Sequence, residues 1–270
     1  MRSAIIAAVG ITLLNLPTLA YAYDKSDLEQ LKKSGSCQDC DLQRSKMHSD
    51  DLKEANLTES NLRDAVLKNV NLDKAQLDDA DMRRSDLEKA NIQDASLKDA
   101  ILIQADLEKA VVINSDFTGA DLRGADLENV DGRRATFDKA DMRQANMKRS
   151  IFENASFKNA RMSEVNLKRA ILNNANFSGA RLKDVRFTRA ELRGATFEDT
   201  DLSQTNFYRA ELNKANFKGA DLEYAIFWLA NLSGADLSKA KNLSDEQLEG
   251  ACGNTDTKLP SDVKALPQCN

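Results

Sequence analysis

A large apolar residue returns at almost every fifth position between residues 42 and 237, and this regularity constrains the fold more than any other feature. Of the forty positions in this series, 22 are Leu, ten are Phe, five are Met, and the other three are Ile92, Val112 and Gly132. The position two residues earlier is Ala in 27 of the forty repeats. None of these residues carries a reactive group, so the repeat predicts an architecture and no chemistry.

A continuous α-helix cannot bring this series of side chains to one face. A helix turns about 100° per residue, so a step of five residues moves the side chain by about 140° around the axis. In an extended chain, residues two apart share a face, so the small and the large residue of one repeat can both point inward. The next small residue lies three positions further on and points outward unless the chain bends. We therefore expect one bend per repeat and a chain that closes into a coil.

The phenylalanines indicate how many repeats make one coil, because all ten lie in the large apolar series. A coil of three repeats would place Gly132 above Phe117, and a coil of five would place Met142 there. Two sets of phenylalanines are instead spaced by twenty residues: Phe117, Phe137, Phe157, Phe177, Phe197 and Phe217, and then Phe187, Phe207 and Phe227. We predict four repeats per coil, about ten coils, and a solenoid roughly 48 Å long if hydrogen-bonded coils lie about 4.8 Å apart.

The repeated unit, such as ADLRG at residues 120–124 and ADLSK at residues 235–239, resembles the pentapeptide-repeat family over about residues 40–240. The resemblance implies an all-β fold, a right-handed quadrilateral parallel β-helix. It implies no single function, because members range from topoisomerase-protecting proteins to proteins of unknown role. Three residues depart from the pattern: Asp50 at a small inward position, Gly132 in the large series and β-branched Val112. We interpret them as weak points in packing, since a missing Leu-sized group can cost about 2–5 kcal/mol.

The first 22 residues have the three regions of a secretory signal peptide: Arg2, an apolar run over residues 4–16, and the small-residue stretch AYA at residues 20–22. We predict cleavage after Ala22 and a mature protein that is exported, either periplasmic or secreted. The apolar run is shorter than the roughly 20 residues that a membrane-spanning helix needs, so we do not expect the chain to span a membrane. An uncleaved N-terminal anchor helix is the alternative.

Segments on either side of the repeats predict caps that cover the unpaired backbone edges of the solenoid. Residues 23–39 form the predicted N-terminal cap, with a short helix over residues 26–33 that Ser26 caps and Gly35 ends. The predicted β-helix covers residues 40–240. Residues 241–270 form the predicted C-terminal cap, where Ser244 and Gln247 resemble a capping box that opens a second short helix.

The four cysteines would permit two disulfides in an oxidising compartment. We expect Cys252 and Cys269 to pair and to fold the C-terminal tail back on itself. Cys37 and Cys40 form a CxxC, for which a redox motif or half of a metal site is one interpretation. The other is inward packing or a local disulfide, because Cys37 falls in the large register and Cys40 in the small one.

Charge and side-chain chemistry exclude several functional classes. The net charge of −5 is too small to indicate a general polyanion binder or a strongly acidic DNA mimic. A zinc site would need Cys37, Cys40 and His48, the single histidine, with Asp39 or Asp41, at a spacing unlike that of zinc fingers. We therefore expect no metal, no cofactor, no small-molecule substrate and no enzymatic activity.

One edge of the predicted solenoid gathers basic and aromatic side chains, because residues twenty apart stack on neighbouring coils. Tyr, Trp and Arg are enriched at protein interfaces, and the single Trp of the chain lies on this edge. The competing interpretation is a solvated charge ladder with no partner. The candidate partner-binding edge consists of Lys148, Arg149, Lys168, Arg169, Arg186, Arg189, Tyr208, Arg209, Tyr224 and Trp228.

The sequence favours a non-enzymatic, exported structural or interaction scaffold that presents ladders of side chains to another macromolecule. We expect the partner to be a protein or an envelope component, and we expect no nucleic acid; a homodimer through the C-terminal aromatic coil is a further form of partner. The alternative, implied by the resemblance, is a DNA-mimicking modulator or protector of a type II topoisomerase, which would require a cytosolic location. A mimic needs acidic columns; Glu88, Glu108 and Glu128 form one, but Lys89 and Lys109 lie beside it.

Overall fold

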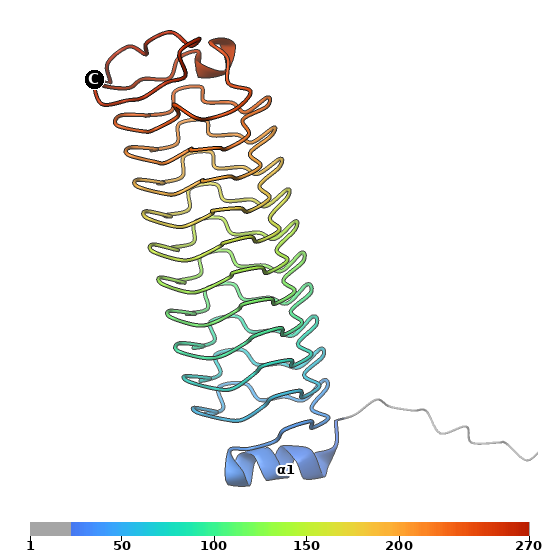
Figure 1. Ribbon diagram of the computed structural model, residues 1–270. Helices are drawn as coiled ribbons and strands as arrows, with labels where there is room; N and C mark the ends of the chain where they lie inside the picture. The colour runs from blue at the N-terminus through green and yellow to red at the C-terminus, as the bar shows by residue number, and fades with distance from the viewer. Residues whose placement is uncertain (1–22, 270) are drawn as a thin grey trace, which may run out of the picture.

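The computed structural model describes residues 23–269, so the predicted signal peptide at residues 1–22 lies outside the described residues. Within them, the chain winds into a stack of coils around one axis (Figure 1). Isolated parallel bridges join residues twenty apart, from Ser36 with Asn56 to Asp221 with Lys241. A spacing of twenty residues is four five-residue repeats, so each coil has four sides.

Each repeat has the same local conformation. A bridging residue comes first, the buried large residue follows, two turn residues come next, and the buried small residue ends the repeat. The second turn residue is left-handed, with φ 59° at Arg189, and the Arg189 N–H donates to the Tyr208 carbonyl of the next coil at 2.8 Å. The Asp or Asn before the large residue also holds the bend: the Asn206 side-chain oxygen accepts from the Tyr208 N–H at 2.9 Å. This hydrogen bond explains why Asp and Asn are frequent at that position.

The core is a continuous column of Leu, Phe, Met and Ala inside the coils, and all ten phenylalanines are fully buried. Along the series from Phe117 to Phe217, neighbouring rings stack with centroids 4.8–5.2 Å apart. The series from Phe187 to Phe227 stacks at 5.0–5.1 Å, and rings of the two series meet edge-on at 5.9–6.0 Å. The spacing of twenty residues therefore produces aromatic columns along the solenoid axis.

One of the three predicted weak points, Gly132, is not weak. A Cβ atom at Gly132 would lie 2.1 Å from Cε1 and 2.5 Å from Cδ1 of Phe152, so this ring fills the space that the missing side chain leaves. Asp50 is only partly enclosed, because its side chain is 30% exposed and pairs with Lys32 at 3.3 Å, but one of its carboxylate oxygens is buried and accepts no hydrogen bond. The prediction at Gly132 was wrong because the pattern alone does not show that the next coil places a ring there.

The N-terminal end of the solenoid is covered by helix α1, Lys25–Ser34 (Figure 1). Its N-cap is Asp24, whose carboxylate accepts from the Ser26 N–H at 2.8 Å, so the prediction that Ser26 caps the helix was wrong by two residues. Gly35 ends the helix in the left-handed conformation, with φ 67°. Leu31 is the buried residue of the helix and packs on the core of the first coil.

The C-terminal segment leaves the twenty-residue register. Asn231 pairs with Cys252 and Asp236 with Lys258, because a short 3₁₀ helix, η1 (Glu246–Leu248), is inserted before them. The predicted capping box is half formed: the Ser244 N–H donates to the Gln247 side chain at 2.8 Å, but no side chain caps η1. Across residues 23–269, no helix is both long and apolar enough to cross a membrane.

Candidate functional site

The regular turns bring most of the predicted edge together as an open groove. It has a volume of about 410 Å³, and we call it the basic groove. The side chains that line it form two columns, residues 148, 168, 188 and 208 in one and residues 149, 169 and 189 in the other, because the turn residues of successive coils stack directly on one another. The basic groove is lined by Lys148, Arg149, Lys168, Arg169, Thr188, Arg189 and Tyr208.

Ion pairs neutralise one end of the basic groove and leave the rest positive. Glu128 pairs with Lys148 at 3.5 Å and with Arg149 at 2.7 Å. A hydrogen bond from Asn146 and the charges of these two residues lower the pKa of Glu128. The remaining lining cations, Lys168, Arg169 and Arg189, have no acidic side chain within 4.0 Å in the described part of the chain. The positive charge of the groove is therefore concentrated on its C-terminal coils.

Four residues of the predicted edge lie outside the basic groove. Arg209 places its guanidinium 5.2 Å from the centre of the Tyr208 ring, in cation–π contact next to the groove. Arg186 lines a separate depression together with three other polar side chains. Tyr224 and Trp228 line another pocket, near the C-terminal end. The structure thus divides the edge that the sequence predicted into parts with different surroundings.

The column of Glu88, Glu108 and Glu128 on the same edge is neutralised by neighbouring cations. Lys68 and Lys89 both pair with Glu88, and their hydrogen bonds lower the pKa of Glu88 to about 2. Glu108 pairs with Lys109 at 2.6 Å. This column therefore presents ion pairs to the solvent and not a strip of negative charge.

The C-terminal pocket contains residues that the sequence did not predict. It has a volume of about 260 Å³, and besides Tyr224, Ala225, Ile226 and Trp228 it is lined by Glu246, Gln247 and Glu249. The sequence did not predict the last three because we assumed that residues twenty apart always lie on neighbouring coils. These three residues come after the point where the spacing between bridged residues changes. The sequence-based prediction also missed Thr188 in the basic groove, although Thr188 lies in the same column as Lys168 and Tyr208.

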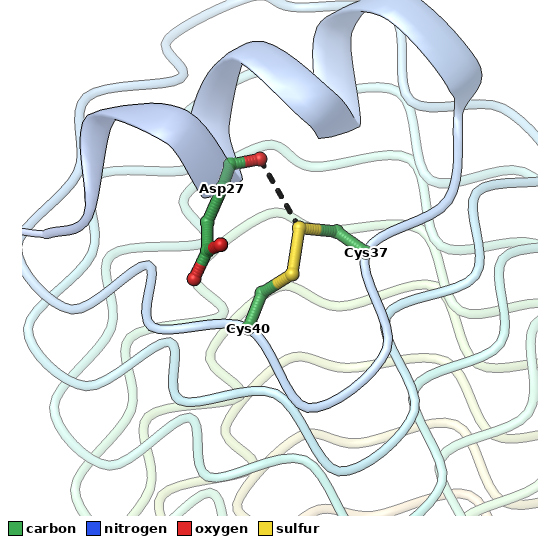
Figure 2. Close-up of side chains that lie close together, drawn as sticks. All are labelled: Asp27, Cys37 and Cys40. Carbon is green, nitrogen blue, oxygen red and sulfur yellow. Dashed lines mark hydrogen bonds between the residues drawn. A yellow bond between two sulfur atoms is a disulfide. The ribbon is translucent and has the colours of Figure 1, made fainter.

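The cysteines near the N-terminus do not offer free thiolates. Ligand atoms of Asp27, Cys37 and Cys40 lie within 4.8 Å of one another, but the two cysteines form a disulfide (Figure 2). The Cys37 sulfur lies 3.1 Å from the Asp27 carbonyl oxygen, and the Asp27 carboxylate accepts from the Asp41 N–H at 2.8 Å. These contacts fasten helix α1 to the first coils. His48 is exposed and is not part of this group, so the structure does not assemble the zinc ligands weighed from the sequence.

A second disulfide joins Cys252 to Cys269. It holds the C-terminal tail against the last coil, where Gly253 and Gln268 form a bridge. The cysteines in the described residues are therefore all oxidised.

Two models of known protein families match the repeats of this chain. A family model for the pentapeptide repeat region matches residues 130–207 and 150–227. A second model, for eight copies of the pentapeptide repeat, matches residues 51–88, 85–129 and 215–252. No curated protein matched the chain.

Several solved structures are similar to the chain. HetL, a pentapeptide repeat protein involved in heterocyst differentiation regulation in the cyanobacterium Nostoc, is 28% identical over 74% of this chain and 88% of its own, with a TM-score of 0.34. A trypsin-treated form of QnrB1, a plasmid-mediated fluoroquinolone resistance protein, is 19% identical over 67% of this chain and 88% of its own, with a TM-score of 0.49. A thylakoid-lumen pentapeptide repeat protein of Arabidopsis thaliana is 27% identical over 37% of this chain and 68% of its own, with a TM-score of 0.32. Because the two family models together run from residue 51 to residue 252, the chain belongs to the pentapeptide-repeat family.

Proposed function

We propose that the protein is a non-enzymatic, exported scaffold that binds another macromolecule through the side-chain ladder of the basic groove. The observation that carries the proposal is the set of three lining cations, Lys168, Arg169 and Arg189, with no acidic side chain near enough to pair with them among residues 23–269. The backbone that carries these cations is already ordered in the stacked coils, so binding restricts only their side chains, which suits recognition of a partner.

The groove fits an acidic protein surface or another anionic envelope component. Its positive charge would attract such a partner and orient it along the edge. Tyr208, at the end of the groove, adds an aromatic side chain of the kind enriched at interfaces. A solenoid edge of this kind offers contact area rather than an enclosed reaction chamber, which favours binding over catalysis.

Export is the second part of the proposal. It is supported by the sequence of residues 1–22 and by the two disulfides, since structural disulfides persist mainly in oxidising compartments. We expect fractionation to recover the protein outside the cytosol and intact-mass analysis to give a chain that starts at Tyr23. Recovery in the cytosol with residues 1–22 attached would contradict export.

The topoisomerase alternative receives less support. A DNA mimic must present uncompensated negative charge, whereas each glutamate in the column of Glu88, Glu108 and Glu128 is paired with at least one lysine or arginine. Cytosolic recovery of the protein would nevertheless direct the search for partners to this alternative.

Charge reversal tests the basic groove. We expect Lys168→Glu with Arg189→Glu to abolish capture of partners from an envelope extract, because it replaces two unpaired cations by anions. The matched control is Lys139→Glu with Lys158→Glu, which makes the same change in net charge on exposed turns of another corner. Equal capture by both double variants would show that the groove is not the binding surface.

A further inference from the structure

The C-terminal pocket differs from the rest of the predicted edge in both shape and charge. Large apolar side chains that are exposed, within the described residues, are confined to one six-residue stretch: Tyr224 (68% exposed), Ile226 (46%), Trp228 (43%) and Leu229 (43%). Three of these four line the pocket of about 260 Å³, and no lysine or arginine lines it. An apolar surface of this kind on the outside of a solenoid is a mark of a binding site.

Backbone contacts hold the walls of this pocket in place. The indole of Trp228 lies over Gly250, so closely that a Cβ atom at Gly250 would be 3.3 Å from the ring. The Gln247 side-chain amide donates to the carbonyl oxygens of Leu222 and Ala225, the latter at 3.2 Å. The aromatic wall on the last regular coil and the carboxylate wall after η1 are therefore fixed relative to each other.

The two carboxylates of the pocket form no close ion pair in the described residues, although a hydrogen bond from Ser244 and, more weakly, the charge of Lys264 lower the pKa of Glu246. Glu246 and Glu249 are exposed, and neither has a basic group within 4.0 Å across residues 23–269, whereas the neighbouring Asp245 pairs with Lys264 at 2.9 Å. The faces of aromatic rings are also regions of negative potential. The pocket thus combines an apolar aromatic surface with an acidic rim, next to a groove of the opposite charge.

We propose that this pocket binds an organic cation, a group in which alkyl carbon surrounds or carries a positive nitrogen. Such a group gains contact with the rings of Tyr224 and Trp228 and attraction from Glu246 and Glu249. A hydrated metal ion would gain nothing from the rings, and an anion or a neutral apolar group would gain nothing from the carboxylates. The inference is independent of the proposed function, which concerns the basic groove.

The chain provides its own reporter for the test, because Trp228 is its single tryptophan. Choline is titrated into the full-length mature protein at constant ionic strength, and Trp228 fluorescence is recorded. 3,3-Dimethylbutan-1-ol, in which carbon replaces the charged nitrogen, serves as the neutral probe of the same shape. We expect a Kd for choline of about 1 mM and binding of the neutral probe at least about tenfold weaker. Equal affinities, or no binding of choline, would overturn the proposal.

N-acetyl-arginine amide distinguishes the two sources of such a cation. Binding tighter than that of choline would indicate a side chain of a partner protein as the natural ligand, and weaker binding would indicate a small quaternary ammonium compound. Either result supports the pocket as a site for organic cations, provided that the neutral probe binds more weakly than both.

Matched variants assign the binding to the carboxylates. We expect Glu246→Gln with Glu249→Gln to weaken choline binding at least about fivefold, with a circular dichroism spectrum unchanged from wild type. The control, Glu54→Gln with Glu59→Gln, removes the same charge from exposed turns at the opposite end and should leave the Kd unchanged. Equal effects of both double variants would overturn the assignment. The groove variants Lys168→Glu with Arg189→Glu should still bind choline, so failure of one site is distinguishable from failure of the other.

Discussion

At the scale of single residues, Gly132 shows how the identity of one side chain depends on the coil above it. The Phe152 ring occupies the space of a side chain at residue 132, and it also packs edge-on against Phe137 and Phe157, at 5.6 and 5.7 Å. We predict that Gly132→Ala lowers the free energy of unfolding by about 1–3 kcal/mol, because the added methyl group displaces a buried ring. Thermal unfolding followed by circular dichroism measures the change.

A compensating substitution checks this explanation. Gly132→Ala combined with Phe152→Leu should recover part of the lost stability, since Leu leaves room for the methyl group. If Gly132→Ala is as stable as the wild type, Gly132 marks an unfilled cavity after all.

The ion pairs of Glu88 predict that the stability of the fold depends on pH. Hydrogen bonds from Lys68 and Lys89 lower the pKa of its carboxyl group from 4.5 to about 2. A carboxyl group whose pKa is lower in the folded state stabilises the fold above its unfolded pKa, and this contribution is lost as the pH falls from about 4.5 towards 2. We expect the NMR chemical shift of the Glu88 carboxyl carbon to titrate near pH 2. In Lys68→Ala with Lys89→Ala, the midpoint should return towards 4.5, and an unchanged midpoint would contradict the assigned cause.

At the scale of elements, the regular coils and the two ends differ in how far the sequence predicts them. The spacing of twenty residues between phenylalanines predicted the stacking of coils and hence the columns of the basic groove. It could not predict the C-terminal pocket, because η1 changes the spacing and brings Glu246 and Glu249 beside Trp228. It also could not show that the Phe152 ring enters the space at Gly132, since side-chain direction depends on packing in three dimensions.

A disulfide holds the C-terminal tail against the last coil. Cys252 and Cys269 are separated by 17 residues, and a disulfide across such a loop stabilises a protein by about 2–4 kcal/mol. We predict that Cys252→Ser with Cys269→Ser makes the tail after residue 253 sensitive to limited proteolysis, while the repeats stay resistant because each coil contacts only its neighbours. Mass spectrometry of the fragments locates the cleavage sites. Cleavage within the repeats at the same rate would mean that the disulfide stabilises the solenoid as a whole.

At the scale of the whole molecule, charge is distributed unevenly along one edge of the solenoid. The N-terminal part of this edge carries ion pairs around Glu88 and Glu108, and the middle carries the basic groove. The C-terminal coil carries the aromatic pocket with its acidic rim. A partner with an acidic segment followed by a basic or quaternary ammonium group would satisfy both sites at once, and the rigid solenoid would fix the distance between them.

The orientation of the groove predicts how an acidic partner binds. The cations of the lining run over two coil steps, from Lys148 to Arg189, which at about 4.8 Å per step is about 10 Å along the axis. An extended peptide rises about 3.4 Å per residue, so about four residues span these cations. We predict that the affinity of labelled oligoglutamates, measured by fluorescence anisotropy, rises steeply up to about four residues and only slightly beyond, and that it falls with added salt. An affinity independent of peptide length would mean that the anion crosses the coils instead of following the axis, because it would then meet the cations of one coil only.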